Sequence, residues 1–196
     1  MSIFLTGGSG FIGSSVATRL TKAGHRVRGL VRDPGKAAAV RATGVEPVIG
    51  TLDDAALLTR EAREADAVVN AASSDHRAAV EALVAGLSGS GKPLLHTSGT
   101  SIVGDEAMGE PSDRVFDEDM TITPKPDKMA RVALDRFVLG APGVRAVVLC
   151  NSLIYGHSLG LSDAQSVQLP RLVKHARKSG KSREVARFLA TAFRSR

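Results

Sequence analysis

Cysteine and aromatic residues are scarce in this sequence. Its 196 residues include one cysteine, one tyrosine and no tryptophan. The single thiol, Cys150, excludes an internal disulfide and fits a reducing compartment. Long apolar runs are also missing, since none approaches the roughly 20 residues of a membrane-spanning helix. The chain starts on an expected strand and not on a leader peptide, so we expect a cytoplasmic protein without a membrane partner.

Acidic residues are rare at the C-terminal end. Residues 171–196 contain nine Lys or Arg and one acid, Glu184, whereas the other 170 residues contain 17 basic and 19 acidic groups. The net charge of +6 therefore belongs to a basic tail, and the rest of the chain is close to neutral. Such a tail can touch nucleic acid or an acidic membrane, but it is more often only solvated. We expect no specific nucleic-acid partner.

Potential metal ligands and nucleophiles do not form a recognisable pattern. The five histidines are scattered, without metal-ligand spacing, so we expect no metal: His25, His76, His96, His157 and His175. Asp75 and His76 are interpreted as a solvated start of a helix. Cys150 lies in an apolar run and is interpreted as a small core residue and not as a nucleophile.

Short apolar runs alternate with helical patterns through the first 150 residues. The runs lie at 2–5, 26–31, 45–49, 66–71, 93–97 and 144–150, and the helical patterns near 12–23, 34–43, 53–64, 75–88 and 125–139. Strands separated by helices require right-handed crossovers, which give a parallel sheet with helices on both faces. The sequence therefore predicts an α/β fold, a doubly wound parallel sheet of the Rossmann type with about six strands in the order 3-2-1-4-5-6.

Several residues mark the expected joints between these elements. Gly24 is expected just past the end of the first helix, and Pro34 at the start of the second. Asp53 is expected to cap the third helix. The polar segment 104–126 is typical of a long surface loop.

Three glycines follow the first strand in TGGSGFIG, residues 6–13. Gly7 allows a tight turn, Gly10 lets backbone N–H groups approach a pyrophosphate, and Gly13 lets the helix pack close to the sheet. The N-terminus of that helix presents free N–H donors and a partial positive charge to phosphates. The glycines therefore predict a dinucleotide site.

The G-x-x-G-x-x-G spacing within TGGSGFIG resembles the short-chain dehydrogenase/reductase superfamily, in particular its extended, epimerase/dehydratase-like branch. The resemblance runs from residue 2 to about residue 156. Further matching segments are GTLDD (50–54), VVNAASS (68–74), LLHTSGTSIVG (94–104) and LCNSLIYG (149–156). It implies a nicotinamide dinucleotide and a small-molecule substrate.

The resemblance and the glycine pattern together give the expected cofactor-binding residues. Asp53 is placed near the adenine, the VVNAASS segment against the adenosine part, and the LCNSLIYG segment at the nicotinamide end. The full set is Gly7, Ser9, Gly10, Phe11, Ile12, Gly13, Arg32, Asp53, Ala71, Ala72, Asn151 and Ile154.

The end of the second strand favours NADP over NAD. An NAD enzyme usually places an acid there to bind the ribose 2′-OH, but that position is Val31, and Arg32 follows. A guanidinium can bind a 2′-phosphate through paired, charge-assisted hydrogen bonds. Asp33 precedes Pro34 and is interpreted as a cap or turn residue.

The catalytic residues of the family are only partly matched. The resemblance implies a Tyr, a Lys four residues later and a nearby Ser or Thr, yet the only tyrosine, Tyr155, lies in the IYG motif. Gly99 stands where the catalytic hydroxyl often falls, between Ser98 and Thr100. Ser98, Thr100, Lys128 and Arg131 are the catalytic candidates.

The chain after the YG motif is short for the extended branch. We expect a dinucleotide-binding domain at 1–156 and, at 157–196, a remnant of the substrate-binding portion with a basic C-terminal helix. Within 182–194, apolar residues recur at spacings of three and four. We expect this helix to pack on the body or on a second subunit, and so to favour a homodimer.

Two functions of different classes fit these observations. The first is an NADP(H)-binding oxidoreductase or epimerase-like protein that acts on a small carbonyl, hydroxyl or sugar-nucleotide-like substrate. The alternative is a non-catalytic NAD(P) sensor, whose ligand changes its grip on a partner. The missing tyrosine favours the sensor, whereas the matched segments around residues 98–100 and 151–156 favour the enzyme.

Overall fold

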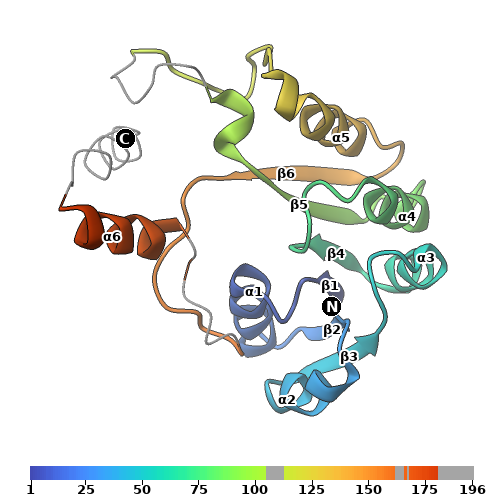
Figure 1. The fold of residues 1–196 in the computed structure, drawn as a ribbon. Coiled ribbons are helices and arrows are strands. Elements are labelled where there is room, and N and C mark those ends of the chain that lie inside the picture. The colour runs from blue at the N-terminus through green and yellow to red at the C-terminus, as the bar shows by residue number, and fades with distance from the viewer. Residues whose placement is uncertain (105–112, 162–165, 167, 181–196) are drawn as a thin grey trace.

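The computed structural model of the chain describes residues 1–104, 113–161, 166 and 168–180. Six strands form one parallel sheet in the order β3-β2-β1-β4-β5-β6, which confirms the predicted topology (Figure 1). The strands are β1 (Ser2–Thr6), β2 (Arg26–Val31), β3 (Val45–Ile49), β4 (Ala67–Asn70), β5 (Pro93–Gly99) and β6 (Arg145–Asn151).

The helices follow the predicted crossovers. They are α1 (Phe11–Lys22), α2 (Ala37–Ala42), α3 (Ala55–Glu64), α4 (Arg77–Leu87), α5 (Met129–Leu139) and α6 (Gln168–Ser179). Short 3-10 turns precede α2 at Pro34–Lys36 and α5 at Pro126–Lys128. α1 begins one residue earlier than its sequence pattern, and α2, α3, α4 and α5 begin two to four residues later than theirs. The patterns therefore located the helices better than their ends.

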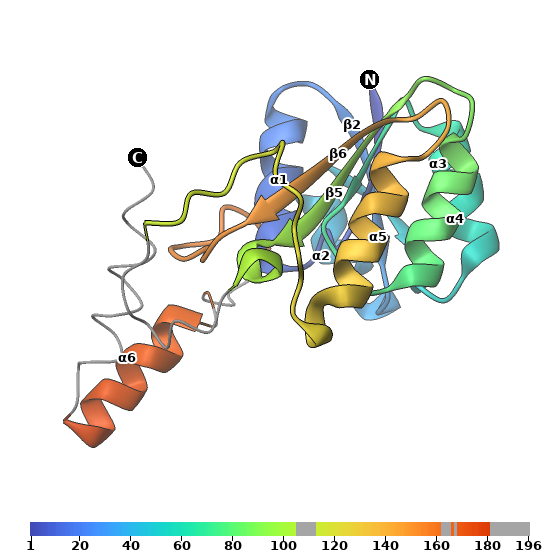
Figure 2. The same cartoon turned by 90° about the horizontal axis from the view of Figure 1, so that it is seen from above.

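Two separate apolar cores lie on the two faces of the sheet. Neighbouring residues of β1 point to opposite faces, so Phe4 belongs to one core and Leu5 to the other, and both are fully buried. The first core is completed by α3, α4 and α5, and the second by α1 and α2. Figure 2 shows α1 and α5 on opposite sides of the sheet. Helices on both faces explain why the middle residues of β1 and β4 are apolar on both sides of the sheet.

The expected joints are confirmed except at the third helix. Gly24 follows the last residues of α1 with φ of +81°, and the Asp33 carboxylate accepts a hydrogen bond from the Gly35 amide in the turn before α2. The cap of α3 is Asp54 and not Asp53: the Asp54 carboxylate accepts from the Leu57 amide at 3.0 Å. The prediction was wrong by one residue because both positions carry the same capping side chain.

The outer strand β6 is less covered than the sequence predicted. Cys150 is exposed, so its interpretation as a core residue was wrong. On the face of the sheet that α1 packs against, Val147 and Leu149 remain 45% and 40% exposed. Within the part of the chain that the structure describes, β6 pairs with β5 alone, and this edge position explains why an apolar strand is not a buried one.

The chain after β6 returns to α1. The Ser15 hydroxyl accepts a hydrogen bond from the Leu159 amide at 3.0 Å, and the Ser14 and Ser158 hydroxyls lie 3.1 Å apart. Beyond this contact, α6 extends away from the sheet (Figure 2). The predicted helix at 182–194 lies outside the described residues, and the division at residue 156 stays a prediction. None of the helices that the structure describes is long and apolar enough to span a bilayer.

We predict that Asp54→Ala lowers the free energy of unfolding by about 1 kcal/mol, because α3 loses its side-chain cap. Asp53→Ala is the matched control: the Asp53 side chain is 86% exposed and its carboxylate contacts His76, and an exposed pair contributes little. Urea denaturation of both variants measures the difference. Equal losses for the two variants would contradict the assignment of the cap.

Candidate functional site

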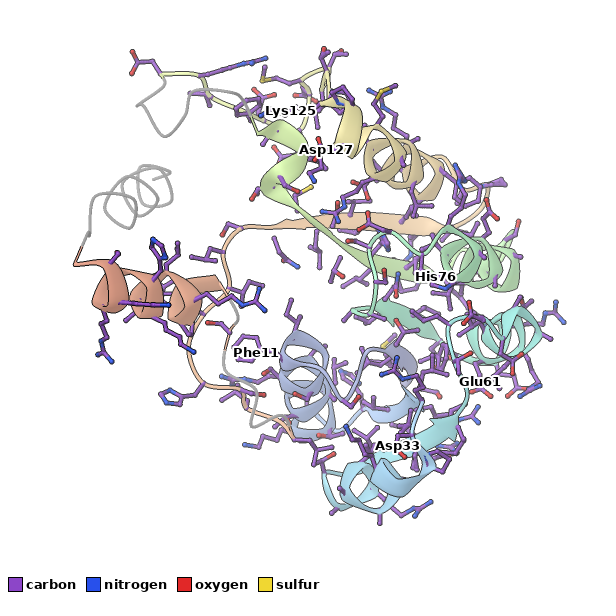
Figure 3. All side chains as sticks on the ribbon, viewed as in Figure 1. Phe11, Asp33, Glu61, His76, Lys125 and Asp127 are labelled. Atoms are coloured by element: carbon purple, nitrogen blue, oxygen red, sulfur yellow. The ribbon has the colours of Figure 1, made fainter. Side chains whose placement is uncertain are left out.

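The candidate site lies where the carboxyl ends of the strands meet. The chain leaves β1 toward β2 and leaves β4 toward β5, so the connections diverge between the neighbouring strands β1 and β4. Open α/β sheets bind ligands in the crevice at such a switch point. Figure 3 labels Phe11 at the start of α1, His76 at the start of α4 and Asp127 in the turn before α5.

Two glycines of the 6–13 segment are required by close backbone contacts. Gly7 has a φ of +72°, and a Cβ there would lie 2.4 Å from the Ala71 carbonyl oxygen. A Cβ on Gly13 would lie 2.1 Å from the Gly7 carbonyl oxygen. No other residue fits at either position without displacing backbone. These contacts join the loop after β1 to the loop after β4 and hold α1 against both.

The third glycine, Gly10, lies beside open space. Among the atoms of the described residues, a Cβ on Gly10 would have one neighbour within 4 Å, the Gly7 oxygen at 3.2 Å. Gly10 is also the N-cap of α1 and provides no side-chain hydrogen bond, and the first turn of the helix contains no acid. The amides of Phe11 and Ile12 therefore present donors and the positive end of the helix dipole to an open surface. A pyrophosphate fits this arrangement.

Two predicted adenosine-side residues lie at the same edge. Val31 is buried as the last residue of β2, and Arg32 directly after it is exposed. Asp53 follows β3, and its carboxylate lies 3.1 Å from Nε2 of His76. The other imidazole nitrogen of His76 accepts from the Ala79 amide and caps α4. His76 is thus a cap linked to Asp53, and not merely a solvated helix end.

Arg131 is held over the ends of β4 and β5. Its guanidinium donates to both carboxylate oxygens of Asp75, with Nε at 2.8 Å from Oδ1, and to the Ser101 hydroxyl at 3.2 Å. This guanidinium holds the pKa of Asp75 below its usual range. Lys128, one turn earlier, lies 2.8 Å from Asp127. Asp75 and Ser101 belong to the site although the sequence analysis did not select them.

The two hydroxyl candidates on either side of Gly99 have different surroundings. The Ser98 hydroxyl is buried and donates to Oδ2 of Asp135 on α5 at 2.7 Å. Thr100 is exposed, and its hydroxyl lies 3.4 Å from the Asn151 carbonyl oxygen. A Cβ on Gly99 would lie 3.6 Å from the Arg131 guanidinium. Tyr155 is 48% exposed in the segment after β6.

A buried polar chain runs beneath this edge. The Thr6 hydroxyl donates to Oδ1 of Asn70, and Nδ2 of Asn70 lies 2.9 Å from Nδ1 of His96. Nε2 of His96 faces Oδ1 of Asp135 at 3.6 Å. Burial lowers the pKa of His96 and raises the pKa of Asp135. Burial therefore favours the neutral form of the His96 imidazole.

The sequence itself indicates the contact between His96 and Asp135 in this buried polar chain. Residues of β5 alternate between the two faces, which places His96 on the same buried face as Leu94 and Ser98. Asp135 lies among the buried positions Val132, Leu134 and Val138 of α5. Polar residues at buried positions of two adjacent elements predict a contact. Within the described ranges, no three His, Cys, Asp or Glu side chains gather closely enough to hold a metal ion.

Comparison with known proteins agrees with this site. A family model described as NAD(P)H-binding matches residues 7–132, which include the glycine loop and the start of α5. The chain belongs to this NAD(P)H-binding family. Solved structures that share its fold include a protein of the short-chain dehydrogenase/reductase superfamily from Agrobacterium tumefaciens and the enzyme WbmG from Bordetella bronchiseptica.

Three similar proteins illustrate how far the likeness extends. The oxidase UcsJ of Acremonium is 34% identical over 196 aligned residues, which cover 88% of this NAD(P)H-binding protein and 56% of the oxidase. A solved structure from Burkholderia cenocepacia is 29% identical with a TM-score of 0.65, covering 91% of this chain and 61% of that one. The UDP-glucose 4-epimerase of Bifidobacterium longum shares the fold, with a TM-score of 0.63 and 18% identity over 90% of this chain and 62% of that one. The chain spans about half the length of the curated relatives it matches.

We predict that the protein loses stability as the pH falls below about 6.5, the value for an unperturbed histidine. Because the native pKa of His96 is lowered, the unfolded chain binds a proton that the folded chain does not. The loss reaches at most about 1.4 kcal/mol per pH unit for one proton. Urea denaturation between pH 7.5 and 5.5 measures the slope, which His96→Asn should reduce. His157→Asn, at an exposed position, is the control and should leave the slope unchanged.

Proposed function

We propose that the protein binds NADP(H) and acts as an oxidoreductase or epimerase-like enzyme on a small carbonyl or hydroxyl compound. The observation that supports this most directly is the uncapped, acid-free start of α1 beside an open Gly10, at the switch point of the sheet. The alternative is a dinucleotide sensor without turnover, which the unmatched tyrosine favours.

The pyrophosphate binds at the glycine loop in this proposal. Ser9 and Gly10 are exposed there, and the amides of Phe11, Ile12 and Gly13 begin α1. Gly7 shapes the loop by its contact with Ala71. Backbone amides and a helix dipole neutralise phosphate charge without a specific side chain, so this part of the site accepts either nicotinamide dinucleotide.

Arg32 makes the choice between the two dinucleotides. It directly follows the last residue of β2 and is exposed, and the residue before it, Val31, is buried and apolar. An arginine provides paired donors to a 2′-phosphate, whereas no carboxylate at the tip of β2 accepts from a 2′-hydroxyl. Asp53 is placed near the adenine, and Ala72 near the adenosine. In this proposal Arg32 therefore binds the 2′-phosphate of NADP, and the 2′-hydroxyl of NAD has no partner at the same place.

The substrate lies over the ends of β5 and β6 in this proposal, near Asn151 and Ile154. A bound nicotinamide supplies hydride exchange with carbon. Thr100 is the hydroxyl that reaches solvent there, and Arg131 is a fixed cation held by Asp75 and Ser101. Thr100 is assigned to bind the substrate oxygen, Arg131 to bind the ribose and polarise that oxygen, and Lys128 to add positive charge. Ser98 positions Asp135 and α5 through its buried hydrogen bond.

We predict that Arg32→Ala weakens NADPH binding by about 1.5–3 kcal/mol, the contribution of a hydrogen bond to a charged group, and leaves NADH binding unchanged. Gly10→Val places a branched side chain in the open space above the loop and should abolish binding of both dinucleotides. Isothermal titration calorimetry with NADPH and NADH measures both effects. Equal affinity of the unmodified protein for NADH and NADPH would contradict the role of Arg32.

Turnover decides between enzyme and sensor. We expect NADPH oxidation, followed by its absorbance, with at least one member of a panel of aldehydes, ketones and sugar nucleotides. Thr100→Ala should lower kcat about 10- to 100-fold if its hydroxyl stabilises the reacting oxygen. Tyr155→Phe is the control, because the phenol is assigned no role. Tight NADPH binding without turnover of any panel member would support the sensor instead.

A further inference from the structure

We propose that His96 is a positioning residue. From beneath the dinucleotide site, it fixes the position of the glycine loop relative to α5, the helix that carries Arg131. This inference rests on the proposed dinucleotide binding and adds to it a residue that no ligand touches. His96 is fully buried, so it acts through its neighbours and not on the substrate.

The imidazole stands at the centre of a directed chain of hydrogen bonds. An amide nitrogen only donates, so Nδ2 of Asn70 donates to Nδ1 of His96, 2.9 Å away. In a neutral imidazole the proton then lies on Nε2. The Asn70 oxygen accepts from the Thr6 hydroxyl. With this tautomer, the Asn70 side chain links Thr6 on β1 to His96 on β5.

The other nitrogen of the ring faces α5. Nε2 of His96 and Oδ1 of Asp135 are both buried, and neither has a hydrogen-bond partner among the described atoms. They lie 3.6 Å apart, too close for a water between them, since two hydrogen bonds of about 2.8 Å would need a wider gap. The two atoms are therefore each other's partner, across a contact slightly longer than a hydrogen bond.

Each end of this chain of polar side chains is adjacent to a part of the proposed site. Thr6 immediately precedes Gly7, and Asn70 immediately precedes Ala71, whose oxygen contacts Gly7. Asp135 lies one helical turn after Arg131 on the same helix. The backbone oxygen of Asn70 also accepts from the Thr97 hydroxyl. One imidazole thus connects the segments assigned to the pyrophosphate with the helix assigned to the nicotinamide ribose.

Two substitutions separate the two halves of this connection. His96→Asn places an amide oxygen near the position of Nδ1 and can still accept from Asn70, but it loses the donor to Asp135. His96→Gln places an amide nitrogen near the position of Nε2 and can still donate to Asp135, but it loses the acceptor for Asn70. His96→Asn should therefore release α5, the helix that carries Arg131, from its contact with residue 96. His96→Gln should release Asn70 and the glycine loop.

The test compares binding of NADPH with binding of its 2′,5′-ADP fragment by calorimetry. We expect His96→Asn to raise the Kd of NADPH about tenfold, because the loss of the contact with Asp135 lets the helix that carries Arg131 shift, with an unchanged Kd for 2′,5′-ADP. His96→Gln should raise both. Leu94→Ala is the matched control: Leu94 is equally buried on the same face of β5, so its variant loses stability but should keep both affinities.

Three results would overturn the inference. Variants that lose stability but keep both affinities would leave His96 a purely structural residue. In the unmodified protein, imidazole nitrogen NMR shifts should show a neutral His96 ring protonated on Nε2 between pH 8 and 6.5. The opposite tautomer would refute the proposed chain of contacts, and this measurement does not depend on the folding of the variants. An unmodified protein that binds neither NADPH nor NADH would refute the proposed function, and with it this role.

Discussion

The close approach of Gly7 to Ala71 is the constraint on which the rest of the site depends. It brings the loop after β1 against the loop after β4, so that a side chain of any size at position 7 would occupy the same space as the Ala71 carbonyl. α1 begins only four residues after Gly7 and packs Gly13 against the Gly7 carbonyl. The position of the α1 N-terminus at the switch point follows from these two backbone contacts.

The sheet converts this local constraint into a site that spans several elements. Parallel strands all end at one edge, so residues that follow β1, β2, β3, β4 and β5 come together there although they lie far apart in the sequence. The two apolar cores fix the strands from both faces. Polar groups at the strand ends then have only small freedom, as the paired contacts of Arg131 with Asp75 and of Ser98 with Asp135 show.

The sequence predicts the parts of this arrangement that have a local or periodic cause. Strand positions, their order and the glycine loop follow from alternation, spacing and the absence of side chains. The cap at Asp54 was missed because two adjacent aspartates offer the same local chemistry. The contacts of His96 with Asn70 and Asp135 join residues 26 and 39 positions away, and Arg131 meets Asp75 across 56 positions. Such pairings depend on the register of strands and helices, which no local pattern encodes.

The exposed face of β6 has a practical consequence for handling the protein. Val147 and Leu149 present apolar surface on an edge strand, and its outer row of amide and carbonyl groups has no strand partner among the described residues. Apolar edge strands are templates for pairing between molecules. Purified protein should therefore self-associate more readily as its concentration or the ionic strength rises, and mild detergent or arginine in the buffer should counteract this association.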